Sequence, residues 1–130
     1  MKRATLIVWE GDDRLASLLR PWAVQQRWQV RQPRTEQELL SQGTAAHPGG
    51  VVLRFGRDLE REFALLARLS TALPDLAIVV VLPEPDETLA GLAWDLGACE
   101  VLPWLRCRER LVPLIARLFP VSEAPHAPPA

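Results

Sequence analysis

Four short runs of the chain are apolar at nearly every position, namely residues 5–9, 50–55, 76–82 and 101–102. They are rich in Val, Ile and Leu and do not alternate with polar residues, which is typical of strands buried on both faces of a parallel sheet. A weaker run at residues 28–30 alternates apolar and polar side chains, as an edge strand does. The pattern therefore predicts five strands.

Between these runs, apolar residues recur at intervals of three and four positions, which predicts helices that each lay one stripe against the sheet. The stripes fall within residues 15–22, 59–73, 89–96 and 111–118. Thr35 followed by Glu38 is a capping-box pattern and predicts a further short helix that ends near Gly43. Pro21 lies inside the first stripe and predicts a kink or an early helix end there.

The alternation of strand and helix implies an α/β domain with a parallel sheet and helices on both faces. We expect this domain to span residues 1–119. Residues 120–130 are rich in Pro and Ala, so we expect them to form a flexible tail outside the core.

Charge and composition exclude several classes of partner. The formal net charge is -1, and the fourteen arginines appear interleaved with acids, so we expect no binding of nucleic acid or anionic lipid. No stretch reaches the ~20 apolar residues that a membrane helix needs. The apolar run at residues 4–9 is too short for a signal peptide, which predicts a cytoplasmic protein.

Residues with catalytic or metal-binding chemistry are few. No glycine-rich phosphate loop follows the first predicted strand. His47, His126, Cys99 and Cys107 do not have the spacing of a metal cluster, and we expect Cys99 to be a buried thiol. The sequence therefore predicts no enzyme activity, no metal and no cofactor.

Two segments carry a resemblance to a known family. Residues 74–105 resemble the second half of a bacterial response-regulator receiver domain: a strand, a helix that ends in an Ala-x-x-x-Gly-Ala phrase at residues 93–98, and another strand. Residues 6–31 look like the receiver's first strand, acidic loop, first helix and second strand. The resemblance implies a flavodoxin-like, doubly wound five-stranded parallel sheet, (β/α)5, of order 2-1-3-4-5.

The resemblance also implies where a phosphorylation site belongs. In receivers, two acids after the first strand and an Asp ending the third hold Mg²⁺, that Asp accepts the phosphoryl group, and a Ser or Thr and a Lys bind its oxygens. The corresponding positions here are Glu10 and Gly11 for the acids, Arg54 for the acceptor, Leu82 or Pro83 for the hydroxyl, and Trp104 or Pro103 for the lysine. The one lysine of the sequence is Lys2, so no shift of register restores it. The chain is therefore similar to a degenerate pseudo-receiver without a phosphoacceptor.

Three readings of this degenerate site are open. Arg54 takes the place of the metal and forms an ion pair with Glu10, or else it binds a small anion. Alternatively, Glu10, Asp12, Asp13 and Asp58 rebuild an acidic site that responds to metal or phosphate. Asp58 is also a plausible N-cap for the helix that follows it.

If the chain does not take up a phosphoryl group, we expect it to act through contacts made by its surface. In receivers, the face made by the fourth helix, fifth strand and fifth helix pairs with a second copy or an output partner. The candidate interaction residues on that face are Trp94, Trp104, Arg106 and Arg110, since Trp and Arg most often anchor interfaces. We therefore expect a phosphorylation-independent interaction module in signal transduction, either a homodimer through this face or an adaptor.

Overall fold

The computed structural model of the chain describes residues 4–45 and 48–118. Strands and helices alternate along it. The elements are β1 (Thr5–Trp9), α1 (Arg14–Gln26), β2 (Gln29–Arg31), α2 (Glu36–Thr44), β3 (Pro48–Arg54), α3 (Leu59–Ala72), β4 (Ile78–Leu82), α4 (Glu87–Asp95), β5 (Glu100–Pro103), the 3₁₀ turn η1 (Trp104–Arg106) and α5 (Cys107–Leu118). The strands form one parallel sheet of order β2-β1-β3-β4-β5, which confirms the predicted fold class.

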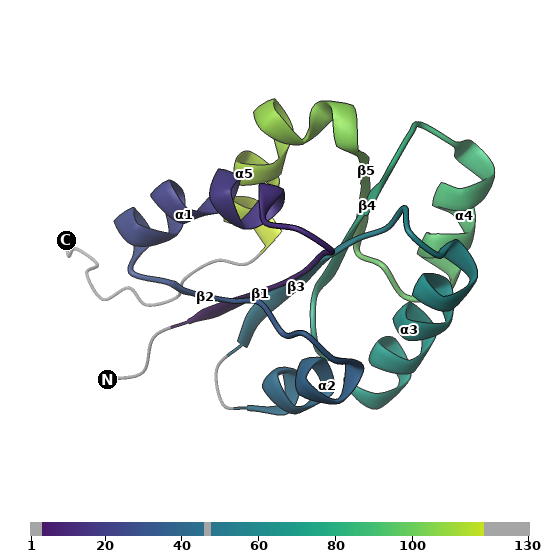
Figure 1. Ribbon diagram of the computed structural model, residues 1–130, viewed down its shortest axis with the longest axis horizontal. Helices are drawn as coiled ribbons and strands as arrows, with labels where there is room; N and C mark the ends of the chain where they lie inside the picture. The colour runs from purple at the N-terminus through teal and green to yellow at the C-terminus, as the bar shows by residue number, and fades with distance from the viewer. Residues whose placement is uncertain (1–3, 46–47, 119–130) are drawn as a thin grey trace, which may run out of the picture.

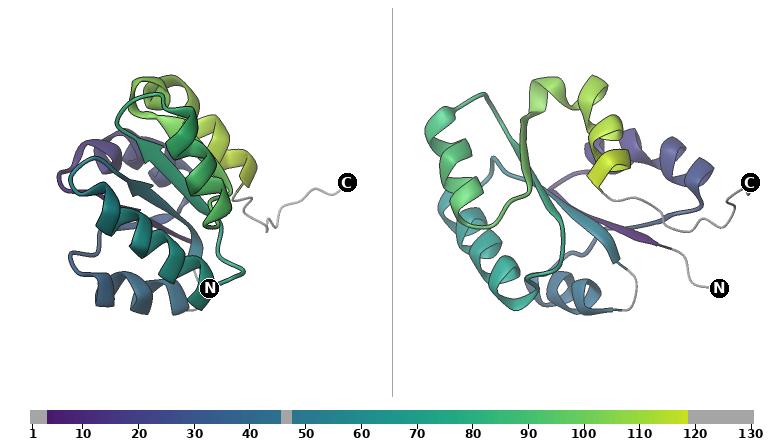
Figure 2. Two further views of the ribbon diagram at one scale, coloured as in Figure 1. Left: turned by 90° about the vertical axis from the view of Figure 1, so that its right-hand side faces the viewer. Right: turned by 180° about the vertical axis from the view of Figure 1, so that it is seen from behind.

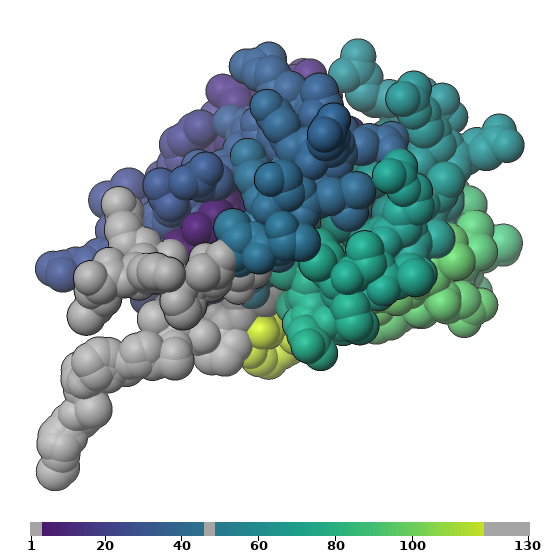
Figure 3. All heavy atoms as spheres, turned by 90° about the horizontal axis from the view of Figure 1, so that it is seen from below, coloured from purple at the N-terminus to yellow at the C-terminus, as the bar shows by residue number. Residues whose placement is uncertain are grey.

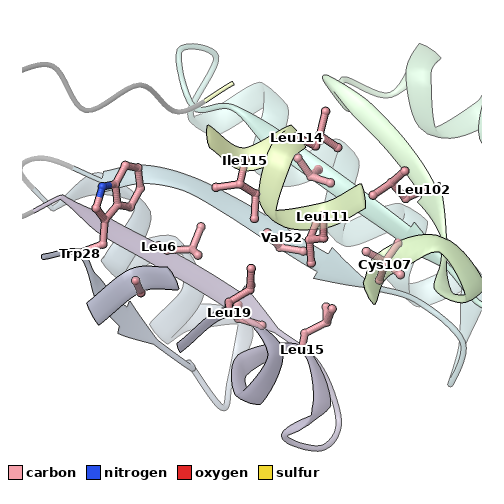
Figure 4. Packing of buried hydrophobic residues seen from close by; sticks show 14 residues of the cluster. Leu6, Leu15, Leu19, Trp28, Val52, Leu102, Cys107, Leu111, Leu114 and Ile115 are labelled. Atoms are coloured by element: carbon pink, nitrogen blue, oxygen red, sulfur yellow. The ribbon is translucent and has the colours of Figure 1, made fainter. Parts of the chain in front are cut away.

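Helices cover both faces of the sheet. Helices α1 and α5 lie on one face and α2, α3 and α4 on the other (Figure 1; Figure 2 shows the same layers from the side and from behind). Each face has its own core. Figure 4 shows the α1/α5 side, where Leu6 and Val52 of the sheet meet Leu15 of α1 and Leu111 of α5. Each such fully buried aliphatic side chain stabilises the fold by about 1.5–3 kcal/mol.

The strand register determines which side chains meet at the carboxyl ends of β1 and β3. Val8 pairs with Val52, and both lie in the core beneath α1 and α5. Because side chains alternate between faces, the residues two positions further on, Glu10 and Arg54, leave the sheet on that same side. All five strands are parallel, so their carboxyl ends share one edge. Glu10 and Arg54 are therefore brought together there.

Some details differ from the predictions. Helix α1 continues through Pro21 to Gln26, so the predicted early end is wrong. Cys99 is exposed and Cys107 is buried, so the prediction of a buried Cys99 is also wrong. The predicted tail at residues 120–130 and both histidines lie outside the described residues. No helix in the described part of the chain is long and apolar enough to cross a membrane.

Candidate functional site

Arg54 is the last residue of β3 and points its guanidinium at two carboxylates. One of its terminal nitrogens, Nη1, lies 2.8 Å from Oδ1 of Asp12 and 3.4 Å from Oε1 of Glu10. The Arg54 side chain is only 20% exposed and Glu10 is fully buried. Charge-assisted hydrogen bonds of this kind are stronger than neutral ones, and partial burial reduces screening by salt. The predicted ion pair between Arg54 and the acidic loop is therefore present.

Glu10 has a second role that the sequence did not reveal. Its two carboxylate oxygens accept hydrogen bonds from the backbone N–H groups of Leu15 (2.9 Å) and Ala16 (3.0 Å), in the first turn of α1. Asp13 holds the N-cap position of that helix, but its side chain makes no capping hydrogen bond. Glu10 thus satisfies two donors that a helix start otherwise leaves unpaired, and its negative charge lies at the positive end of α1.

Asp12 completes the acidic loop. It accepts a hydrogen bond from the backbone N–H of Arg14 (3.0 Å) as well as the bond from Arg54. The Arg14 N–H, with help from the positive charges of Arg54 and Arg14, lowers the pKa of Asp12 below its ordinary value of 3.8, against a smaller opposing effect of burial. Asp12 is therefore a carboxylate at neutral pH, and it holds Arg54 at the mouth of the site.

Trp104 closes the other side of the guanidinium. It follows β5 as the first residue of η1, and the Arg54 guanidinium carbon lies 4.0 Å from the centroid of its ring. Cations at this distance from an aromatic face are attracted by its electron-rich surface. Trp104 packs against the core that contains Cys107, where burial raises the pKa of the Cys107 thiol to about 11, although the Arg54 charge acts in the opposite direction. Arg54 thus joins the ends of β1, β3 and β5.

A second arginine covers the rest of the acidic loop. A Cβ atom added to Gly11 would clash with Nη1 of Arg57, so the Arg57 side chain occupies the space that a side chain at position 11 would need. Both arginines line an open pocket at this edge of the sheet, together with Asp12 and Asp58. Of the two positions predicted for the acidic pair, Glu10 therefore has a buried, hydrogen-bonded side chain, and Gly11 has no side chain and is covered by Arg57.

Buried carboxylate Glu62 shapes the loop that carries Arg57. It lies in the first turn of α3 and accepts hydrogen bonds from the backbone N–H groups of Gly56 (2.8 Å) and Arg57 (3.3 Å). Asp58 caps α3 by accepting from the backbone N–H of Arg61 (3.3 Å), as predicted. The sequence analysis missed Glu62, because a glutamate near a helix start is ordinary and its burial depends on the path of the loop.

The predicted hydroxyl position contributes nothing polar to the site. Leu82 ends β4 and is buried in the core beneath α3 and α4. Pro83 follows it and is exposed. Neither side chain has a hydrogen-bonding group, so neither can bind the oxygens of a phosphoryl group.

Comparisons with known proteins agree with this architecture. No family model matches the chain, and no curated protein matches its sequence. Solved structures do match. A CheY-like protein (tadZ) from Pseudomonas aeruginosa is 22% identical with a TM-score of 0.76, and the match covers 98% of this chain and all of that one. A response regulator from Thermotoga maritima is 16% identical with a TM-score of 0.77, covering 92% of this chain and all of the other. The chain has the receiver fold.

A Mg²⁺ site of the kind the receiver fold implies does not fit these residues. Hard divalent cations need several free oxygen ligands. Both oxygens of Glu10 already accept N–H groups, Asp12 is bonded to Arg54, and Gly11 offers no side-chain oxygen. Among residues 4–45 and 48–118, no group of three or more His, Cys, Asp or Glu side chains is arranged to hold a metal ion. The guanidinium of Arg54 carries its positive charge among these acids instead.

The predicted interaction face of this receiver fold has an exposed apolar surface. Trp94 on α4 is 46% exposed, and Arg106 on η1 and Arg110 on α5 are exposed as well. Trp104 is partly buried in the site, while its neighbour Leu105 is 75% exposed. Leu105 is thus an apolar contact on this face that the sequence analysis missed.

Proposed function

We propose that the chain is a pseudo-receiver: a non-catalytic, phosphorylation-independent protein–protein interaction module in signal transduction. The observation that carries this proposal is the position of Arg54, which ends β3 and is bonded to Asp12 and Glu10. Arginine cannot accept a phosphoryl group, and its charge is permanent at any physiological pH. It therefore opposes a divalent cation in the same space.

The receiver fold supports a role in signalling, but it does not indicate which partner the chain binds. Solved structures of similar shape include the chemotaxis protein CheY4 of Vibrio cholerae and a putative pilus assembly protein, CpaE2, of Sinorhizobium meliloti. Because one fold serves such different systems, the partner has to be argued from the surface of this chain.

We assign the interface to the α4–β5–α5 face, defined here by Trp94, Leu105, Arg106 and Arg110, and the partner to a second copy of the chain. Residues 83–103 contain five acids and no basic residue, whereas residues 104–110 contain three arginines and one acid. Helices α4 and α5 flank the edge strand β5, so a two-fold axis through this face sets α4 of one copy against α5 of the other. Acidic and basic surfaces then meet around an apolar centre, which is the usual anatomy of an interface.

The mass of the protein in solution tests this assignment. We expect a dimer by sedimentation equilibrium, weakened at least about tenfold by Trp94→Ala or Leu105→Ala, because buried apolar anchors dominate such interfaces. Val24→Ala is the matched control, since Val24 is 74% exposed on α1, a helix that contacts β2 at the opposite edge of the sheet. A monomer at all concentrations, or equal weakening by the control, would contradict the homodimer.

The alternative function is an atypical receiver that responds to metal or phosphate through Glu10, Asp12, Asp13 and Asp58. It requires the acids to release Arg54. A titration with Mn²⁺ followed by NMR distinguishes the two: line broadening centred on residues 10–13 and 58 supports the alternative, and its absence supports the interaction module. The absence of enzyme activity and the cytoplasmic location stay predictions.

A further inference from the structure

A second charged surface lies on the side of the molecule away from the α4–β5–α5 face. Residues 14–35 contain five arginines and no acid, so the expected interleaving of arginines with acids is wrong for this segment. The segment comprises α1, β2 and the loop after it. Strands β2 and β5 are the two edges of the sheet, and Figures 1 and 3 show α1 and α4 at opposite ends of the molecule. A dimer formed through the α4–β5–α5 face leaves this surface open.

Three arginines surround the outer strand β2, and we call them the basic edge: Arg20, Arg27 and Arg31. Arg20 Nη2 donates to Oε1 of Gln32 at 3.0 Å, which places this flank of α1 beside β2. Val24 of α1 lies between Arg20 and Arg27, the residue that ends the helix, and is 74% exposed. An exposed aliphatic side chain within a rim of positive charge fits a partner that is acidic and not purely hydrophilic.

The strand itself has an unpaired side. The backbone N–H of Gln29 donates to the carbonyl of Ala4, and β2 pairs with β1 alone. Backbone groups alternate in direction along a strand, so the N–H and C=O of Val30 point away from β1, toward the outside. The Val30 side chain packs on the α1 side of the sheet, and the exposed Arg31 side chain therefore lies toward the opposite side. An added strand would meet arginine on both of its faces.

The surroundings limit the length of an anionic partner. The acidic loop with Glu10, Asp12 and Asp13 precedes the basic segment, and Glu36 and Glu38 follow it. A long polyanion such as nucleic acid would run from the arginines onto these acids and be repelled. A short acidic segment that does not extend beyond the arginines would not be repelled by these acids.

We propose that the basic edge binds a short acidic polypeptide segment as an extended strand alongside β2. Its backbone pairs with the outward N–H and C=O of Val30, and its acidic side chains alternate between Arg20 and Arg27 on one side and Arg31 on the other. The segment thus binds by strand addition, and the arginines select segments with acidic side chains. The site is separate from the dimer face, so either proposal can fail without the other.

The probe is a labelled ten-residue peptide in which pairs of Glu alternate with pairs of Thr, because two successive Glu place a carboxylate on each face of an extended strand. The matching Lys–Thr peptide and a ten-nucleotide oligo-dT serve for comparison. We expect binding of the Glu–Thr peptide alone, weakened by salt. Arg31→Glu should weaken it at least about tenfold. Arg108→Glu, the charge reversal of another exposed arginine on α5, should change it less than about twofold. No binding at low salt, equal effects of the two reversals, or tighter binding of oligo-dT would overturn the proposal.

The strand geometry has its own test. Val30→Pro removes the outward N–H and leaves the pairing with β1 intact, while Val30→Ala controls for lost packing. We expect Val30→Pro to abolish peptide binding and Val30→Ala to retain it. In the unaltered protein, the Val30 amide NMR signal should shift when the peptide binds. This measurement does not depend on whether either variant folds. A Val30 signal that stays in place while the peptide binds would contradict strand addition.

Discussion

The guanidinium carbon of Arg54 lies 4.0 Å from the centroid of the Trp104 ring, so a cation at the end of β3 is held by an aromatic side chain that follows β5. In receivers, the resemblance implies the reverse arrangement, with an acid ending the third strand and a lysine after the fifth. Here the positive charge lies at the end of β3 instead of after β5. The contact between Arg54 and Trp104 joins the ends of these two strands without a phosphoryl group. The arginine in place of the acid and the tryptophan in place of the lysine are physically coupled, because their side chains contact each other.

Replacing Arg54 with an acid should recreate the electrostatics that Arg54 prevents. In Arg54→Asp, three carboxylates meet at the end of the sheet, and we expect the free energy of unfolding at pH 7 to fall by about 2–4 kcal/mol. Millimolar Mg²⁺ should recover part of this loss in the variant and leave the unaltered protein unchanged. Urea denaturation with and without Mg²⁺ measures both effects.

Arg108→Asp is the matched control for this experiment, since Arg108 is exposed on α5 and has no ion pair within the described residues. It should change stability by less than about 0.5 kcal/mol. An Arg54→Asp protein as stable as the control would show that the ion pair with the acidic loop carries little free energy.

Glu10 should matter more for stability than its neighbour at the helix start. Glu10→Ala leaves two N–H groups of α1 without their acceptor and removes one of the two carboxylates that contact Arg54, and should cost about 2–4 kcal/mol. Asp13→Ala should cost less than about 0.5 kcal/mol, because the Asp13 side chain makes no capping bond. Thermal unfolding of both variants by circular dichroism gives the comparison, and equal costs would refute the capping role of Glu10.

The lowered pKa of Asp12 predicts a pH-dependent contribution to stability. A carboxyl whose pKa is lower in the folded than in the unfolded protein stabilises the fold above its unfolded pKa, and loses that effect as pH falls through the folded pKa. Asp12→Asn should therefore be less stable than the unaltered protein at pH 7, and the difference should shrink below about pH 4. Chemical denaturation across this range tests the trend, and a difference independent of pH would argue against it.

The two thiols should differ sharply in reactivity. Cys99 is exposed, whereas Cys107 is buried and burial raises its pKa to about 11, so it stays a neutral thiol at pH 8. Ellman's reagent should modify one thiol per folded chain and both after denaturation. The Cys99→Ser variant should show no reaction when folded; a fast reaction there would mean that the Cys107 region opens.

The sequence predicts the sheet well, because Val and Ile runs such as residues 78–81 are buried on both faces and leave few alternatives. The resemblance to receivers also predicts the pairing of Arg54 with the acidic loop, because it places both at the carboxyl ends of neighbouring strands. The stacking on Trp104 and the capping by Glu10 depend on the paths of side chains and loops, which no local pattern records. The exposure of Cys99 was missed for a similar reason. Its backbone N–H donates to the carbonyl of Ile78, but the turn two residues before it, at Gly97 with a φ of 116°, sets a chain path that leaves its side chain exposed.

The most direct test of the central claim is a titration of the ¹⁵N-labelled protein with Mg²⁺ and beryllofluoride, which mimics a phosphorylated acid, followed by amide NMR. If Arg54 replaces both cation and acceptor, the signals of residues 10–13, 54 and 104 should stay in place, while those of an ordinary receiver treated in parallel move. Saturable, Mg²⁺-dependent shifts at residues 10–13 would contradict the account and favour a rebuilt acidic site.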